Sequence, residues 1–197
     1  MFAIMPLMKT THVANSGMPS TAGFAHPARN VAMLGVEPGM TVADFGSGSG
    51  AYVLAMAERM AASGKVYAID IQKDLLRRIH NDAQKKGLNI VHILWGDLER
   101  PQGSKLPDAS CDIVLISNLL FQVEDKDALL AEAKRVLKSR GRLVIIDWSE
   151  SFDGMGPIKS HVVNKDAALQ ITKGAGFGTH KEFDAGAHHY GLVLKIV

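Results

Sequence analysis

A glycine-rich run follows directly on a short apolar stretch, and its residue types are suited to binding a cofactor. The run is Gly46-Ser47-Gly48-Ser49-Gly50, and Asp44 stands two positions before its first glycine. Glycine lacks a side chain and tolerates positive φ, so the backbone N–H groups of such a turn can approach a ligand closely. The pattern predicts a site for a nucleotide or nucleoside cofactor.

A second acid supports this interpretation. Asp70 ends the next apolar stretch, about 20 residues after the turn, where an acid is suited to holding ribose hydroxyls. Its carboxylate can accept hydrogen bonds from both hydroxyls at once. Read as Gly46-x-Gly48-x-x-Ala51, the turn also fits the dinucleotide fingerprint G-x-G-x-x-[G/A]. These residues alone therefore leave the choice between a dinucleotide and another nucleoside cofactor open.

The elements that must position these residues are strands alternating with helices from residue 41 onward. The apolar runs at residues 113–116 and 143–146 are typical of strands buried on both faces of a parallel sheet. The last two strands are joined by only three residues, 185–187, which requires an antiparallel pair. The expected strands are 41–45, 65–70, 90–94, 112–116, 142–147, 177–184 and 189–196, and the expected helices are 26–35, 51–62, 73–86, 125–138 and 164–173.

This alternation predicts an α/β fold with a doubly wound, Rossmann-like sheet. In such a sheet, ligands bind outside the carboxyl ends of the strands. Polar or glycine residues stand at five expected strand ends: Asp44 with the glycine-rich turn, Asp70, Gly96-Asp97, Ser117-Asn118 and Asp147.

On these motifs and their order, residues 26–197 resemble the class I S-adenosylmethionine-dependent methyltransferases. Asp44 and the glycine-rich turn are similar to the first motif of that family, Ile69-Asp70 to the second, and Trp95-Gly96-Asp97-Leu98 to the turn that meets adenine. Residues 106–115 and 131–148 are similar to the segments around the fourth and fifth strands. The resemblance implies a seven-stranded sheet of order 3-2-1-4-5-7-6 with the last strand antiparallel, and S-adenosyl-L-methionine as cofactor.

The resemblance also implies the cofactor contacts. The glycine-rich turn would carry the aminoacyl part, Asp70 the ribose and Asp97 the adenine edge. Asp44 would order the turn or engage the ammonium group, although each acid could instead be only a cap or loop-ordering residue. The complete expected set is Asp44, Gly46, Ser47, Gly48, Ser49, Gly50, Tyr52, Asp70, Ile71, Gly96, Asp97, Leu98, Ser117 and Asn118.

The chain departs from the family pattern in two places. The turn before the fifth strand, usually Lys-Pro-Gly-Gly, is Lys138-Ser139-Arg140-Gly141. The connection between the third and fourth strands is short and loop-like, so a substrate-capping helix there must be small or absent.

No catalytic residue is predicted, because methyl transfer needs a general base only when the acceptor still holds its proton. The candidates are His26, Arg29, Asn118, Asp147 and the pair His188-His189. For the histidine pair we expect a solvated turn and a strand-edge side chain. The alternative is that it lines an acceptor pocket, since the final hairpin opens at the ligand edge. No third ligand at metal-binding spacing accompanies the pair, so no metal site is expected.

Composition limits the other classes. The 197 residues carry 22 basic and 20 acidic side chains and a net charge of +2, which is no strong signal for nucleic acid. The single cysteine, Cys111, excludes an internal disulfide, favours the cytoplasm, and is expected to be buried at a strand start. Trp95 and Trp148 are expected in the core. No run reaches the roughly 18 apolar residues of a membrane span.

We therefore expect residues 1–26 to form a flexible arm and residues 27–197 one methyltransferase domain acting on a small molecule. The segment from Leu106 resembles the quinone-biosynthesis branch, whereas residues 63–70 are also similar to RNA and protein methyltransferases. The Asn-Pro-Pro-Tyr tetrapeptide of enzymes that methylate planar amino groups is absent. A nicotinamide-dependent oxidoreductase would need a Tyr-x-x-x-Lys pair or a second domain, and the sequence indicates neither. A non-catalytic cofactor-binding module is a further alternative, and the oligomeric state is not predicted.

Overall fold

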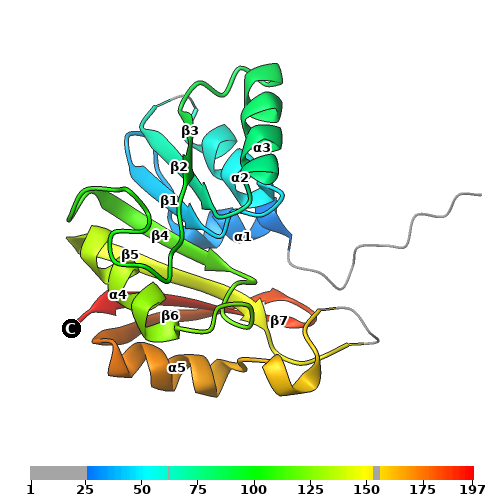
Figure 1. Ribbon diagram of the computed structural model, residues 1–197, viewed down its shortest axis with the longest axis vertical. Helices are drawn as coiled ribbons and strands as arrows, with labels where there is room; N and C mark the ends of the chain where they lie inside the picture. The colour runs from blue at the N-terminus through cyan, green and yellow to red at the C-terminus, as the bar shows by residue number, and fades with distance from the viewer. Residues whose placement is uncertain (1–25, 62, 153–155) are drawn as a thin grey trace, which may run out of the picture.

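The computed structural model describes residues 26–61, 63–152 and 156–197. Within these residues one sheet of seven strands has the order β3-β2-β1-β4-β5-β7-β6 (Figure 1). The first five strands are mutually parallel, and β7 runs antiparallel to both β5 and β6. The predicted topology is confirmed. The strands are β1 Thr41–Phe45, β2 Lys65–Asp70, β3 Val91–Trp95, β4 Cys111–Ser117, β5 Leu137–Trp148, β6 Phe177–Gly186 and β7 His189–Ile196.

The helices begin and end at residues that explain their bounds. In α1, Pro27 occupies the first turn and Gly35 ends the helix at φ 69°. The side chains of Asp125 and Asn164 cap α4 and α5 by accepting hydrogen bonds from Ala128 N (2.8 Å) and Ala167 N (3.0 Å). The helices are α1 Pro27–Leu34, α2 Ala51–Arg59, α3 Lys73–Lys85, α4 Lys126–Val136 and α5 Lys165–Gly174, with a 3-10 turn at Lys159–His161.

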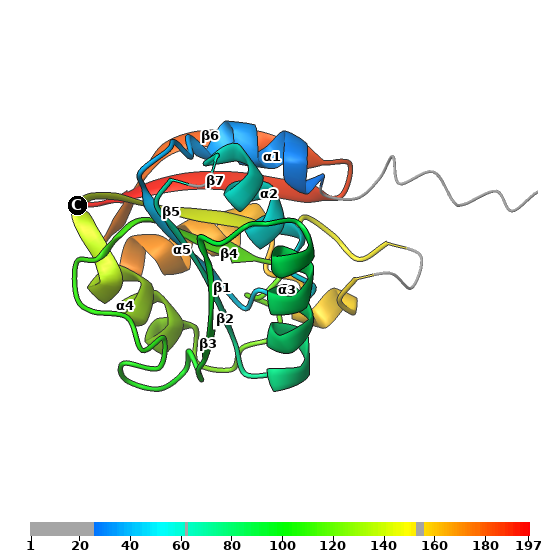
Figure 2. The ribbon, with the colours of Figure 1, turned by 90° about the horizontal axis from the view of Figure 1, so that it is seen from above.

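Helices cover both faces of the sheet (Figures 1 and 2). On one face, α1, α2 and α3 bury side chains such as Leu34, Met56 and Ile79 against one set of strand residues. On the other face, α4 and α5 bury side chains such as Leu129 and Ala168 against the alternate set. Alternation along each strand thus supplies two apolar cores, as a doubly wound fold requires. The expected flexible arm lies outside the described residues, apart from His26.

The expected helix over residues 125–138 is too long, because α4 ends at Val136 and β5 begins at Leu137. Leu137 is extended, with φ −72° and ψ 135°, and it pairs with Cys111 of β4. The amides of Ala109 and Ser110 donate to carbonyls at the end of α4, at 2.9 and 2.8 Å. These contacts draw residues 137–141 into the sheet, so the predicted turn before the fifth strand is an irregular part of β5.

Trp95 is the second correction. It was expected in the core, yet it is 51% exposed, because β3 is an edge strand. Its indole Nε1 donates to Ile71 O at 2.9 Å, and Lys73 Nζ lies 4.9 Å from the ring centroid. Cys111 is buried at the start of β4, as predicted, and Trp148 is 7% exposed.

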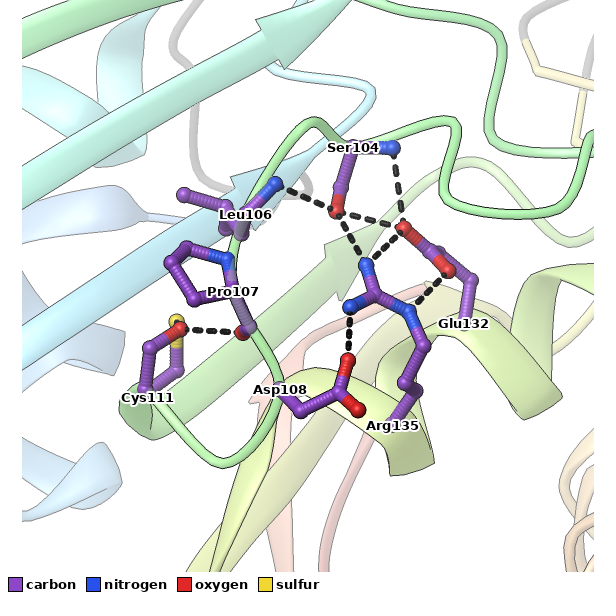
Figure 3. A network of polar contacts seen from close by, with 8 residues as sticks. Ser104, Leu106, Pro107, Asp108, Cys111, Glu132 and Arg135 are labelled. Atoms are coloured by element: carbon purple, nitrogen blue, oxygen red, sulfur yellow. Dashed lines mark hydrogen bonds and ion pairs between the residues drawn. The ribbon is translucent and has the colours of Figure 1, made fainter.

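The connection between β3 and β4, residues 96–110, contains no helix and is fixed to α4 by a polar network (Figure 3). Arg135 contacts both oxygens of Glu132, at 2.9 and 2.7 Å, and also pairs with Asp108. Ser104 donates its amide (2.9 Å) and its hydroxyl (2.5 Å) to Glu132 Oε1. Burial alone would raise the pKa of Glu132, but the hydrogen bonds from Arg135 and Ser104 lower it. The loop is therefore held by an ionised, fully partnered carboxylate.

Two glycines allow this loop to close on itself. A Cβ on Gly103 would lie 1.7 Å from Asp97 O, and a Cβ on Gly96 would lie 2.0 Å from Gly103 O. Backbone therefore occupies the space that either side chain would need.

We predict that Gly103→Ala lowers the free energy of unfolding by about 1–3 kcal/mol or more, because the added methyl group meets backbone that cannot move cheaply. Gly174→Ala is the matched control: no atom lies within 4 Å of its Cβ position, and alanine favours a helix by up to about 1 kcal/mol over glycine. Urea unfolding of both variants tests this. Equal stabilities for the two variants would contradict the close approach.

Candidate functional site

The glycine-rich turn is held by the end of β2. The amides of Gly46 and Ser47 both donate to Ile69 O, at 2.9 and 3.0 Å, and Gly48 N donates to Asp70 Oδ2 at 2.9 Å. A Cβ on Gly46 would meet the Leu119 side chain at 2.8 Å, whereas a Cβ on Gly48 would find no atom closer than 3.9 Å. Gly48, at φ 52°, thus exposes backbone to open space where a ligand could lie.

Two cavities meet at this turn, and both include Gly46, Gly48 and Gln122 in their walls. The first, here the β2–β3 cavity, has a volume of about 160 Å³ and is bordered by the ends of β2 and β3. The second, here the β4–β7 cavity, has a volume of about 300 Å³ and reaches from the turn past β4 to Trp148 and His189. Every residue of the expected cofactor set except Gly50 lines one of the two.

In the β2–β3 cavity, the Asp70 carboxylate is already hydrogen-bonded within the protein. Its Oδ1 accepts from Gln72 N at 2.8 Å, and its Oδ2 accepts from Gly48 N. The loop-ordering role is therefore present. Each carboxylate oxygen has a further lone pair that can accept a hydroxyl.

Asp97, on the turn after β3, also lines this cavity. Its Oδ1 accepts from Glu99 N at 3.1 Å, and Arg100 Nε lies 3.5 Å from its Oδ2. The side chain is 36% exposed, so its carboxylate remains open to a ligand donor. Leu98 is buried beside it, and Ile71 is 58% exposed at the rim.

Asp44, in the β4–β7 cavity, is 2% exposed, and its Oδ1 has no hydrogen-bond partner in the described part of the chain. Burial, and then the nearby charge of Asp70, raise the pKa of this carboxyl to about 7. A cation bound beside Asp44 would stabilise the ionised carboxylate and lower its pKa again.

The end of β4 forms another part of the wall of the β4–β7 cavity. Asn118 has φ 51°, its N donates to Ile146 O at 2.9 Å, and its Oδ1 has no partner among the described atoms. Asp147, a candidate catalytic residue, lines neither cavity. Its Oδ2 accepts from Leu120 N (3.0 Å) and its Oδ1 from Trp148 N (2.8 Å), so it positions the loop after β4. Burial raises the pKa of Asp147 to about 6.

The expectation for the histidine pair is wrong for His189. This side chain is 4% exposed and lines the β4–β7 cavity. His188 instead lies outside the cavity, with its Nδ1 3.1 Å from Glu150 Oε1 and its ring 3.8 Å from that of Phe152. The remaining candidates, His26 just before α1 and Arg29 within it, line neither cavity.

Sequence reasoning missed Asn30, which is fully buried in α1. Its Nδ2 donates to the Tyr52 hydroxyl at 3.0 Å and to Ala185 O at 2.9 Å. It thus ties the first helix to the cavity wall and to the final hairpin. A polar residue on the apolar face of a predicted helix was the available signal. Trp148, which was expected only in the core, also lines the cavity.

In the described ranges, no three histidine, cysteine or acidic side chains gather closely enough to hold a metal ion. Within the same ranges, no helix has the length and hydropathy needed to cross a membrane.

Comparison with known proteins gives a consistent result. A family model for a methyltransferase domain matches residues 36–184. The ubiquinone/menaquinone biosynthesis C-methyltransferase UbiE of Paraburkholderia phymatum is 35% identical over 129 residues, which cover 66% of this chain and 51% of that protein. Its counterpart in Paraburkholderia xenovorans is 31% identical over 160 residues, covering 81% of this chain and 61% of that protein. The chain thus spans about half to three-fifths of the length of these curated relatives.

Two solved structures are also similar. A SAM dependent methyltransferase from Aquifex aeolicus has a TM-score of 0.81 and 28% identity, with 91% of this chain and 94% of that chain covered. A putative type 11 methyltransferase from Sulfolobus solfataricus has a TM-score of 0.65 and 30% identity, with 82% and 84% covered.

We predict that Asp44 makes stability fall as pH rises from about 4 to 7. The unfolded carboxyl ionises near its ordinary pKa of 3.8, whereas the folded one stays protonated until about 7, so the native state binds more protons in this window. Asp44→Asn removes the effect, and urea unfolding at several pH values measures it. Relative to wild type, the variant should gain stability with rising pH. The exposed Asp74→Asn is the matched control, and a wild-type-to-Asp44→Asn difference that does not vary with pH would contradict the prediction.

Proposed function

The chain belongs to the methyltransferase-domain family, and from this premise we propose that it transfers the methyl group of S-adenosylmethionine to a small-molecule acceptor. S-adenosylmethionine is the cofactor implied by the family and by the similar Aquifex aeolicus structure.

The observation that carries the proposal is the pair of cavities that share the glycine-rich turn. S-adenosylmethionine has an adenosine at one end, a charged amino acid at the other, and the reacting sulfonium between them. The β2–β3 cavity offers the Asp70 and Asp97 carboxylates to ribose and adenine donors. The β4–β7 cavity offers the unpartnered oxygens of Asp44 and Asn118 to the ammonium group. The reacting centre would then lie over Gly46 and Gly48.

The residues would act mainly by alignment. S-adenosylmethionine supplies a methyl group already activated by its sulfonium. The turn and the strand ends hold the donor in one orientation, and the far part of the β4–β7 cavity holds the acceptor in line with it. Such positioning accounts for a large share of the rate in two-substrate reactions.

A small acceptor is favoured by the size of the β4–β7 cavity, about 300 Å³, since part of that volume belongs to the methionine moiety. The UbiE relatives, whose names describe quinone-biosynthesis C-methyltransferases, favour the same class. We also propose that residues 27–197 form one domain and that the protein is cytoplasmic. RNA or protein acceptors are alternatives that no contact in the described residues specifically favours.

We predict that calorimetry detects binding of S-adenosylmethionine and S-adenosylhomocysteine to the full chain, and no binding of NADH. The reason is that the two cavities supply partners for both ends of the amino-acid nucleoside. Tight binding of NADH without binding of either sulfur ligand would overturn the proposed function.

We predict that Asp70→Ala weakens S-adenosylmethionine binding by about tenfold to a hundredfold, the value of one hydrogen bond to a charged group. Asp74→Ala, a change at a 79% exposed carboxylate in the first turn of α3, should leave the affinity unchanged. Calorimetry measures both affinities, and circular dichroism checks folding. A folded Asp70→Ala variant with wild-type affinity would refute the ribose contact.

A further inference from the structure

Buried polar atoms without a hydrogen-bond partner gather around the β4–β7 cavity. In the described part of the chain, the residues carrying such atoms are Asn30, Asp44, Ser47, Asn118 and His189. All except Asn30 line the cavity. Burying such a group without a hydrogen-bond partner is unfavourable, so a cluster of them marks a surface shaped for a ligand.

His189 is the member of this cluster that S-adenosylmethionine leaves unexplained. Both of its ring nitrogens lack a partner among the described atoms. Asp44 lies on β1 and Asn118 follows β4, next to the glycine-rich turn. His189 lies on β7, which is separated from β4 by β5 in the sheet. It therefore stands beyond the methionine end of the site, where the acceptor must lie.

On the side of the β4–β7 cavity, the neighbours of His189 include aromatic and apolar side chains. It pairs with Trp148 of β5 across the sheet, and the two ring centroids are 4.3 Å apart at an interplanar angle of 42°. Pro27 and Tyr52 also line the β4–β7 cavity. A flat, largely apolar molecule fits such walls, and its polar group would meet the unpartnered imidazole.

The charges around the cavity favour an acceptor that arrives neutral. Its described lining contains no lysine or arginine to hold an anionic substituent. Burial, and then the neighbouring His188, lower the pKa of His189 to about 4, so the imidazole is unprotonated at neutral pH. Asp44 and Tyr52 are the other titratable groups of this lining, and Asp147, His188 and Tyr190 lie next to His189 in the sheet or the chain. Another cavity, on which His189 also borders, adds Lys165, Asp166, Glu182 and Asp184.

We propose that His189 is a catalytic residue that accepts the hydroxyl proton of a planar phenol or enol as that acceptor takes up the methyl group. The O–H bond breaks, the proton goes to an imidazole nitrogen, and the electron pair stays on the conjugated acceptor. That pair forms the new bond to the methyl carbon, while the carbon–sulfur pair returns to sulfur. If a ring carbon is methylated, its own proton then leaves and the hydroxylated ring is restored.

This inference rests on the proposed function and names the acceptor class and its base. An unprotonated imidazole can accept a proton, and the acceptor anion that forms beside it raises the pKa of His189 above its lowered value, because opposite charges favour each other's ionised form.

The test uses 4-nitrophenol, whose visible absorption reports its own ionisation, bound to the complex of the full chain with S-adenosylhomocysteine. This sulfur ligand carries no sulfonium charge, so it does not itself supply the charge that would ionise the probe. We expect the pKa of the bound probe to lie about 1–3 units lower in wild type than in His189→Gln. His80→Gln, at an exposed position on α3, is the matched control and should behave as wild type, because His80 lines neither cavity.

Calorimetry with S-adenosylhomocysteine separates the two levels of the proposal. If neither wild type nor His189→Gln binds that ligand, the proposed function fails. If both bind it equally but ionise the probe equally, the role of His189 fails alone. If wild type binds it but not the probe, the acceptor class is overturned. His189→Asn provides a second variant should the glutamine disturb folding, and wild type that binds the probe without lowering its pKa overturns the inference by itself.

Discussion

The site depends on the capture of three successive backbone amides by the end of β2. The Ile69 carbonyl takes the amides of Gly46 and Ser47, and the Asp70 carboxylate takes that of Gly48. This capture bends the chain sharply as it leaves β1, so that α2 can turn back over the sheet. It also fixes the position of the glycine-rich turn, which lines both cavities. The shape of the ligand site is thus set by bonds between two neighbouring parallel strands, before any ligand arrives.

Because the scaffold uses Asp70 in this way, a structural role and the proposed ribose contact coincide in one side chain. Asp147 has only the structural part: it holds the amides of Leu120 and Trp148 and faces neither cavity. Asp70 is the last residue of β2 and Asp147 is the last but one of β5, and both are almost fully buried. The difference arises from their neighbours: Asp70 lies beside the open turn, whereas Asp147 is covered by the loop that follows β4.

The gathering of the strand-end residues could be predicted because a parallel sheet brings its carboxyl ends to one edge, whereas the strand order came from the family resemblance. The burial of His189 could not, since it depends on how β7 lies against Trp148, a contact between distant parts of the chain. Asn30 was missed for the same reason: its partners are Tyr52 and Ala185. The end of α4 was misplaced because backbone pairing with residues 109–111 overrides the helical pattern at Leu137.

The reversed direction of β7 has a consequence for how such a protein can diversify. Parallel strands present their last residues at the ligand edge, but β7 presents its first residue there, immediately after a tight hairpin. Changes of length or composition in that hairpin would remodel the His189 wall of the β4–β7 cavity and leave the glycine-rich turn, more than 130 residues earlier in the chain, untouched. Under the proposed function, the part of the fold that binds the donor would thus be separate from the part that selects what receives the methyl group.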